Sequence, residues 1–140
     1  MNSNLERAKN SLEKQNFTCV LCKDDDVFSS TERGISPLIS MLDSGKSYEN
    51  FHAADKVVGK GAAYIYVLLK IKSLYAGILS ESAEEVLNRF GIDVSFSKKV
   101  KRILSRDKTG FCPIESVVLD SDNPEDALFQ IRKKLEELKR

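Results

Sequence analysis

The sequence predicts one α/β domain, a three-layer α/β/α sandwich built around a mixed β-sheet. Segments with helical spacing of apolar residues alternate with β-type apolar runs along the whole chain. The chain has 140 residues, of which 41% are hydrophobic and 31% charged, so it is long enough to bury one core. No stretch has the composition of a linker, and we therefore expect a single domain over residues 1–140.

The first half of the chain is expected to hold a helix, a hairpin, a short helix and a short strand. Apolar residues recur at helical spacing near the N-terminus, and two apolar runs then flank a polar turn. Ser36 followed by Pro37 is typical of an N-cap and a first helical position, and Gly45 ends that short helix. The other expected segments are a helix over 3–14, strands over 17–22 and 27–31, and a short strand over 50–53.

The second half is expected to begin with a long buried helix, capped by Asp55 and running to about Lys70. Its apolar residues cover most of the helix circumference, which predicts a central position in the domain. Further segments follow: a strand over 72–80, a helix over 82–91, a strand over 92–96, a short helix within 98–105, and a turn or short helix up to 118. Residues 123–126 then open a C-terminal helix with one apolar face, formed by Leu128, Ile131, Leu135 and Leu138.

Charge and composition argue against several classes of function. The net charge is +1, from 22 basic and 21 acidic residues, so nothing draws the chain generally toward nucleic acid or membrane. The N-terminus lacks an apolar signal core, and the longest apolar run, 62–69, is too short to span a bilayer. Three cysteines, an odd number, fit reduced thiols. We therefore expect a cytoplasmic protein with no nucleic-acid or membrane partner.

Lys56 and Lys60 are the first candidate site. On one helix they would lie one turn apart, where like charges repel, and near the positive end of the helix dipole. An anion held by both ammonium groups and the helix N-terminus would explain this arrangement. The alternative is a pair of solvated lysines. The segment is not a phosphate-binding P-loop, because Ala54 and Gly61 stand where that motif needs Gly and Ser or Thr.

Gly59 and Gly61 are unusual within the same expected helix. Each costs about 1 kcal/mol relative to Ala in a helix interior. The ordinary explanation is close backbone packing at these two positions.

Cys112 is the second candidate. It directly precedes Pro113, which is expected in the first turn of a helix, and a thiol at a helix start has a lowered pKa and can act as a nucleophile. Arg106, Lys108 and Glu115 are near enough in sequence to tune it. The alternative is a small, partly buried residue in a tight turn, and without an identified base this alternative is favoured.

No metal site is expected. Cys19 and Cys22 are three residues apart on an expected strand, so they point to opposite faces and are interpreted as core residues. His52 is the only histidine, and the three cysteines lack zinc-ligand spacing. No nucleophile motif accompanies His52, so it is interpreted as structural, and we expect no cofactor.

The order of elements resembles the cytidine deaminase-like fold. In that fold the buried helix begins with H-A-E and the next turn carries P-C-x-x-C, which together bind zinc and its water. The first place here has His52 but lacks the glutamate, and the second, at residues 80–85, lacks both cysteines. A zinc-dependent deaminase of the ordinary kind is therefore not expected.

Two motifs resemble more closely a zinc-free bacterial family of the same superfamily, known as a domain of unknown function. The family pattern A-D-K-x-V-G-K-A-A-A is matched over residues 54–63 except at Gly61, and D-x-T-G-x-C-P is matched over 107–113. The segment YAGILSE, which ends at Ser80 and Glu81, is also similar. The resemblance covers nearly the whole chain.

This resemblance implies a pocket at the carboxyl ends of the strands for a small anionic, nucleotide-like ligand. Lys56 and Lys60 would hold the anion, or one of them would act as a nucleophile, while Asp55 would orient them or move a proton. The other residues expected to line the pocket are Gly59, Ser80, Glu81, Asp107, Thr109, Gly110 and Cys112.

Two rival functions remain open. One is a non-catalytic sensor or binding module with the same pocket. The other is a structural or interaction protein, which predicts an exposed apolar face, for example on the C-terminal helix, that forms a homo-oligomer. A homodimer is expected by analogy with the fold alone.

Overall fold

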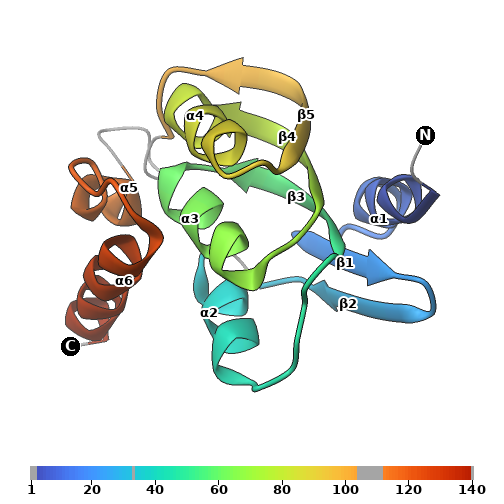
Figure 1. Cartoon of the computed structure of the whole chain (residues 1–140), viewed down its shortest axis with the longest axis horizontal. Helices are drawn as coiled ribbons and strands as arrows, with labels where there is room; N and C mark the ends of the chain where they lie inside the picture. Colours follow the sequence, from blue (N-terminus) through green and yellow to red (C-terminus); the bar gives the residue numbers. More distant parts are fainter. Residues whose placement is uncertain (1–2, 33, 104–111, 140) are drawn as a thin grey trace.

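A computed structural model of the chain describes residues 3–32, 34–103 and 112–139. Helices and strands alternate as the sequence predicts, and Figure 1 shows their arrangement. In chain order the elements are α1 (Ser3–Lys14), β1 (Cys19–Lys23), β2 (Asp26–Ser30), α2 (Ser36–Asp43), β3 (His52–Val58), α3 (Lys60–Leu69), β4 (Ser73–Ser80), α4 (Glu81–Arg89), β5 (Asp93–Val100), α5 (Pro113–Val117) and α6 (Pro124–Leu138).

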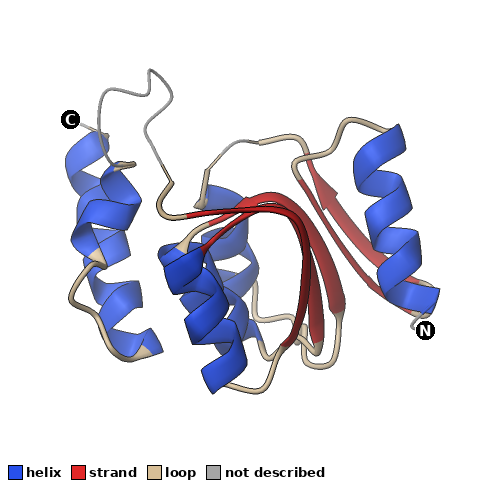
Figure 2. Ribbon diagram, turned by 90° about the horizontal axis from the view of Figure 1, so that it is seen from above, coloured by secondary structure: helices blue, strands red, loops and turns tan. Residues whose placement is uncertain are grey.

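The five strands form one mixed sheet in the order β2-β1-β3-β4-β5. β1 is antiparallel to both β2 and β3, whereas β3, β4 and β5 are parallel to one another. Helix α1 covers one face, and α2, α3 and α4 lie on the other (Figure 2). The predicted α/β/α sandwich is thus confirmed. The pair α5 and α6 adds a further layer, because α6 packs against the outer side of α3.

The core lies mainly between the sheet and α3. Tyr64, Ile65 and Tyr66 of α3 are essentially inaccessible to solvent, so the predicted central helix is confirmed over its apolar part. The other face of the sheet holds a smaller cluster beneath α1. On α6, the predicted apolar face turns inward: Ile131 is fully buried in the main core, whereas Leu138, at the helix end, is 55% exposed.

The predicted start of the central helix is wrong. Residues 52–58 form a strand that pairs with β1 on one side and β4 on the other, and α3 begins only at Lys60. Asp55 therefore lies within β3 and does not cap the helix, whose N-cap residue is Gly59. The helix-forming alanines at 53 and 54 favour a helix in isolation, but pairing on two sides and complete burial override that preference.

Two smaller predictions also need correction. Ile35, not Ser36, is the N-cap residue of α2, and no side chain caps this helix. The short helix expected within 98–105 is wrong over its described part, because β5 continues to Val100, which pairs with Ser80 of β4. By contrast, the predicted opening of the C-terminal helix at residues 123–126 is confirmed, and the Asn123 side chain caps α6 by accepting a hydrogen bond from the Asp126 amide.

The regular pairing of the three parallel strands is interrupted at Gly77 of β4. Gly77 pairs neither with Lys56 of β3 nor with Ser97 of β5, although the residues on both sides of it are paired. The side-chain alternation resets there, because Ala76 and Leu79 are three positions apart yet both enter the main core. A Cβ at Gly77 would lie 2.7 Å from the carbonyl oxygen of Lys56, so this position accepts only glycine without a backbone shift.

Candidate functional site

The N-terminus of α3 is occupied by a carboxylate of the chain itself. Glu115, on the short helix α5, accepts hydrogen bonds from the amides of Lys60 (Oε1, 2.8 Å) and Gly61 (Oε2, 3.0 Å). The Glu115 residue is only 8% exposed. A carboxylate in this position satisfies two of the free N–H groups of the helix and interacts favourably with its dipole. The partner of this helix start is thus an anionic group of the chain itself, and the external anion expected between Lys56 and Lys60 stays a prediction.

The two glycines beside this carboxylate allow its approach. A Cβ at Gly59 would lie 2.5 Å from the Glu115 carboxyl carbon, and one at Gly61 would lie 2.9 Å from Cγ2 of Ile114. The close packing predicted at Gly59 and Gly61 is present, but the atoms nearest to the two glycines belong to side chains and not to another backbone segment. Gly59 precedes the helix rather than lying inside it.

The predicted lysine pair does not share a helix face. Lys56 lies on β3, where its ammonium donates to the side-chain oxygen of Asn16 (3.1 Å). Lys60 is the first residue of α3, and its ammonium donates to the carbonyl of Leu119 (2.8 Å). The repulsion from which the sequence argument inferred a bound anion is therefore absent. A role for either lysine in ligand binding stays a prediction.

Asp55 lies half-buried among other titratable groups. Its carboxylate accepts hydrogen bonds from the Tyr66 hydroxyl (Oδ2, 2.7 Å) and from the Val57 amide (Oδ1, 3.2 Å). Cys19 of β1 is its direct neighbour across the antiparallel pair.

Burial dominates the electrostatics of this group. Desolvation raises the pKa of Asp55 to about 6, against the opposing effect of the Tyr66 hydrogen bond. Burial, with the nearby Asp55 carboxylate, also raises the pKa values of Tyr66 and Cys19 well above their ordinary values. Tyr66 and Cys19 therefore remain protonated near neutral pH, and Asp55 alone changes charge there.

The other predicted residues are spread over three places. Ser80 is buried and caps α4 by accepting a hydrogen bond from the Ala83 amide (3.1 Å), whereas Glu81 is exposed. Cys112 precedes α5, with Pro113 in the first turn as predicted. Its backbone carbonyl accepts from the Ser116 amide. Asp107, Thr109 and Gly110 lie outside the described residues.

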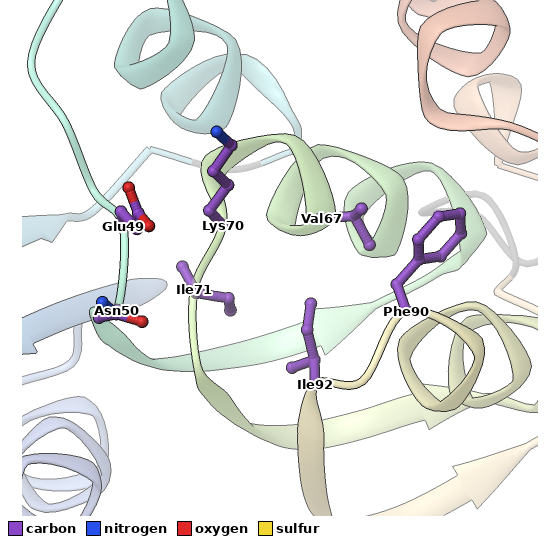
Figure 3. A pocket seen from close by; sticks show the side chains of 7 residues that line it. All are labelled: Glu49, Asn50, Val67, Lys70, Ile71, Phe90 and Ile92. Atoms are coloured by element: carbon purple, nitrogen blue, oxygen red, sulfur yellow. The ribbon is translucent and has the colours of Figure 1, made fainter.

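We describe two hollows that are lined by described residues. The first is at the end of the sheet where the chain enters β3, β4 and β5 (Figure 3). We call it the amino-end groove; it has a volume of about 290 Å³ and is lined by Glu49, Asn50, Val67, Lys70, Ile71, Phe90 and Ile92. The second is a shallow hollow on the outer face of α6, beside Phe129.

Comparison with known proteins identifies the family. The family model described as "TM1506: Domain of unknown function (DUF1893)" matches residues 7–135. The chain belongs to the DUF1893 family. A crystal structure of a DUF1893 family protein (TM1506) from Thermotoga maritima is similar to it, with 28% identity and a TM-score of 0.83. The match covers 98% of this chain and 92% of that one.

More distant likenesses were also found. A dCMP deaminase from the cyanophage S-TIM5 matches in its apo form with 13% identity and a TM-score of 0.49, over 71% of this chain and 100% of that one. The same enzyme in complex with dCMP and dUMP matches with 12% identity and a TM-score of 0.45, over 66% and 92%. These scores are too low to support any inference about ligands. No protein with a curated function matches the chain significantly.

The described part of this DUF1893 protein offers no cluster of three His, Cys, Asp or Glu side chains that could hold a metal ion. His52 instead shares a hydrogen bond with the Ser73 hydroxyl (Nδ1 to Oγ, 2.6 Å), and burial lowers its pKa. His52 was compared with the histidine of an H-A-E motif that begins a helix. That comparison is wrong, because His52 is the first residue of a strand. No described helix is long and apolar enough to cross a membrane.

Sequence reasoning missed two residues of this DUF1893 site. Glu115 was considered only as a neighbour of Cys112, although the unexplained glycines 59 and 61 already indicated a group packed closely above them. Tyr66 was not singled out at all, and only a correct strand assignment for Asp55 would have brought the two residues together.

Proposed function

We propose that this DUF1893 protein binds a small anionic, nucleotide-like ligand beside Asp55, and that Asp55 exchanges a proton with it. The observation that carries this proposal is the position of the Asp55 carboxyl group, held by the Tyr66 hydroxyl and the Val57 amide next to an exposed part of β3, where burial raises its pKa to about 6. A group with this pKa populates both its acid and its base form near neutral pH, as an efficient proton carrier must. Such displaced values are common at functional sites.

The surroundings of Asp55 support an acid–base role. The Tyr66 hydroxyl and the Val57 amide fix the orientation of the carboxyl group. Lys56 and Val57, which follow it in β3, are both exposed, so the strand meets solvent next to the half-buried carboxyl group. Lys56 is the cation nearest in sequence that a ligand's phosphate or carboxylate would meet. The nucleotide-like class comes from the two family-like motifs and is an argument from fold.

The test compares the wild type with Asp55→Asn and a matched control, Asp93→Asn, at an exposed position of β5. Each protein is titrated with nucleoside monophosphates and inorganic phosphate by calorimetry, then incubated with each ligand and analysed by mass spectrometry. We expect one nucleotide to bind and to be converted by the wild type and by Asp93→Asn, but not to be converted by Asp55→Asn. Equal conversion by all three proteins, or no binding of any ligand, would contradict the proposal.

A second candidate is a non-catalytic binding module. It is favoured by a specific observation: the start of α3 and both lysines already have partners within the chain. Reactive groups engaged in this way stabilise the fold instead of turning over a substrate. This candidate predicts that, in the same incubations, the bound ligand is recovered chemically unchanged from both the wild type and Asp55→Asn.

A further inference from the structure

The amino-end groove lies where the chain enters the parallel strands, whereas Asp55 of the proposed site lies farther along β3, and the two sites share no lining residue. Its walls come from the segments that lead into β3, β4 and β5, together with the ends of α3 and α4 (Figure 3). The groove is open to solvent, and its volume of about 290 Å³ is near the lower limit for a small-molecule site. It therefore has room for one small metabolite.

One end of the groove carries two opposite charges. The side chains of Glu49 and Lys70 are both exposed, and neither has a hydrogen-bond or ion-pair partner within the part of the chain that the structure describes. Figure 3 shows both at the same end of the groove, beside Asn50. A ligand that carries an ammonium and a carboxylate group would complement this pair.

The backbone at this end is held in an unfavourable conformation. Lys70 has φ +61° and Asn50 has φ +66°, and the Asn50 amide donates to the carbonyl of Lys70 (2.9 Å). At a helix C-cap in this conformation glycine is the usual residue, because a side chain with a Cβ costs roughly 1–2 kcal/mol. The interaction of a lysine with the helix dipole stabilises this position by only about 0.3–1 kcal/mol, which is less than the cost of the backbone conformation. The position therefore holds a charged side chain where the fold alone favours glycine, as is typical of functional positions.

The other end of the groove is apolar. Ile71 and Ile92 are almost completely buried and form a fixed floor, and Val67 of α3 lies between them and Phe90. Phe90 is 42% exposed, and the guanidinium of Arg89 stacks over its ring, 4.9 Å from the ring centre. An apolar side chain placed along this floor would cover surface that is now exposed to water.

We propose that the amino-end groove is a binding site for an apolar α-amino acid. Its ammonium group pairs with Glu49, its carboxylate pairs with Lys70, and its side chain lies along Val67, Ile71 and Ile92 toward Phe90. This site is separate from the one around Asp55 and does not depend on the function proposed there.

The experiment titrates ¹⁵N-labelled full-length protein with L-leucine and follows its amide resonances. We expect saturable shifts confined to residues around 49–50, 70–71 and 90–92. Glu49→Gln and Lys70→Gly are each expected to weaken binding by roughly tenfold or more, because each removes a charge-assisted contact. Lys72→Gln, an exposed lysine that does not line the groove, is the matched control and is expected to bind like the wild type.

Two features keep the test decisive. Lys70→Gly relieves the left-handed backbone, so it is expected to be more stable than the wild type while binding less, and a loss of binding cannot then come from unfolding. Leucinamide and N-acetyl-L-leucine each lack one of the two charges and are expected to bind more weakly than leucine. The proposal is overturned if leucine causes no saturable shifts, or if both derivatives bind as well as leucine.

Discussion

The carboxylate of Glu115 is expected to be a major source of stability, and Glu115→Ala tests this. The substitution removes two hydrogen bonds of 2.8 and 3.0 Å between a buried carboxylate and helix amides. A hydrogen bond to a charged group contributes about 1.5–3 kcal/mol, and loss of a helix cap costs about 0.5–2 kcal/mol. Water can reach part of the vacated space, so we expect a loss of about 2–4 kcal/mol in the free energy of unfolding.

Urea denaturation followed by circular dichroism measures this loss. Glu115→Gln keeps the shape of the side chain and one acceptor oxygen. Its free energy of unfolding is therefore expected to lie between that of the wild type and that of Glu115→Ala. Glu85→Ala, at an exposed position of α4, is the matched control and is expected to change stability by less than about 0.5 kcal/mol. If Glu115→Ala were as stable as this control, the carboxylate would not be what holds α5 to the start of α3.

Three further predictions concern the sheet and its titratable groups. Gly77→Ala is expected to cost more than about 2 kcal/mol in urea denaturation, because the new Cβ meets a backbone carbonyl at 2.7 Å; a cost below about 0.5 kcal/mol would contradict the close approach. Burial raises the pKa of Asp55 to about 6 from an unfolded value near 3.9, so the folded state binds more protons between these values. The stability of the wild type relative to Asp55→Asn is therefore expected to fall by about 1–2 kcal/mol from pH 4 to pH 7; a constant difference would show that the carboxyl group is solvated. Iodoacetamide is expected to label the partly exposed Cys112 in the folded protein, and Cys19 and Cys22 only after denaturation, as peptide mass spectrometry would show; equal labelling of all three would refute the burial described above.

Elements with local signals at their ends could be predicted from the sequence. Helix α6 begins where Asn123 and Pro124 indicate, because the cap and the first-turn proline act through bonds between close neighbours in the chain. Strand β4 is likewise found within one residue of its predicted start, since an apolar run between turn signals is typical of a buried strand. The mixed sheet followed from one hairpin joined to strands that alternate with helices.

The boundary between β3 and α3 could not be predicted in this way. Two alanines and a potential Asp cap favour a helix locally, and only pairing with β1 and β4, which are distant in sequence, makes the segment a strand. The contact between Glu115 and the start of α3 could not be predicted for the same reason. Lys60 and Glu115 are 55 residues apart, and no local pattern encodes a contact of that range. What the sequence did carry was the two glycines that make room for it.

The bond between Glu115 and α3 also bears on how the chain acquires its structure. The central helix is made early in synthesis, but the group that caps it belongs to a segment made much later, after β5. A nascent chain that ends before Pro113 therefore has an uncapped central helix, and it also lacks Ile131, which packs into the core. Cooperative folding of the sandwich must then await the C-terminal segment, so that the shorter intermediates of translation leave apolar surface for a chaperone to cover.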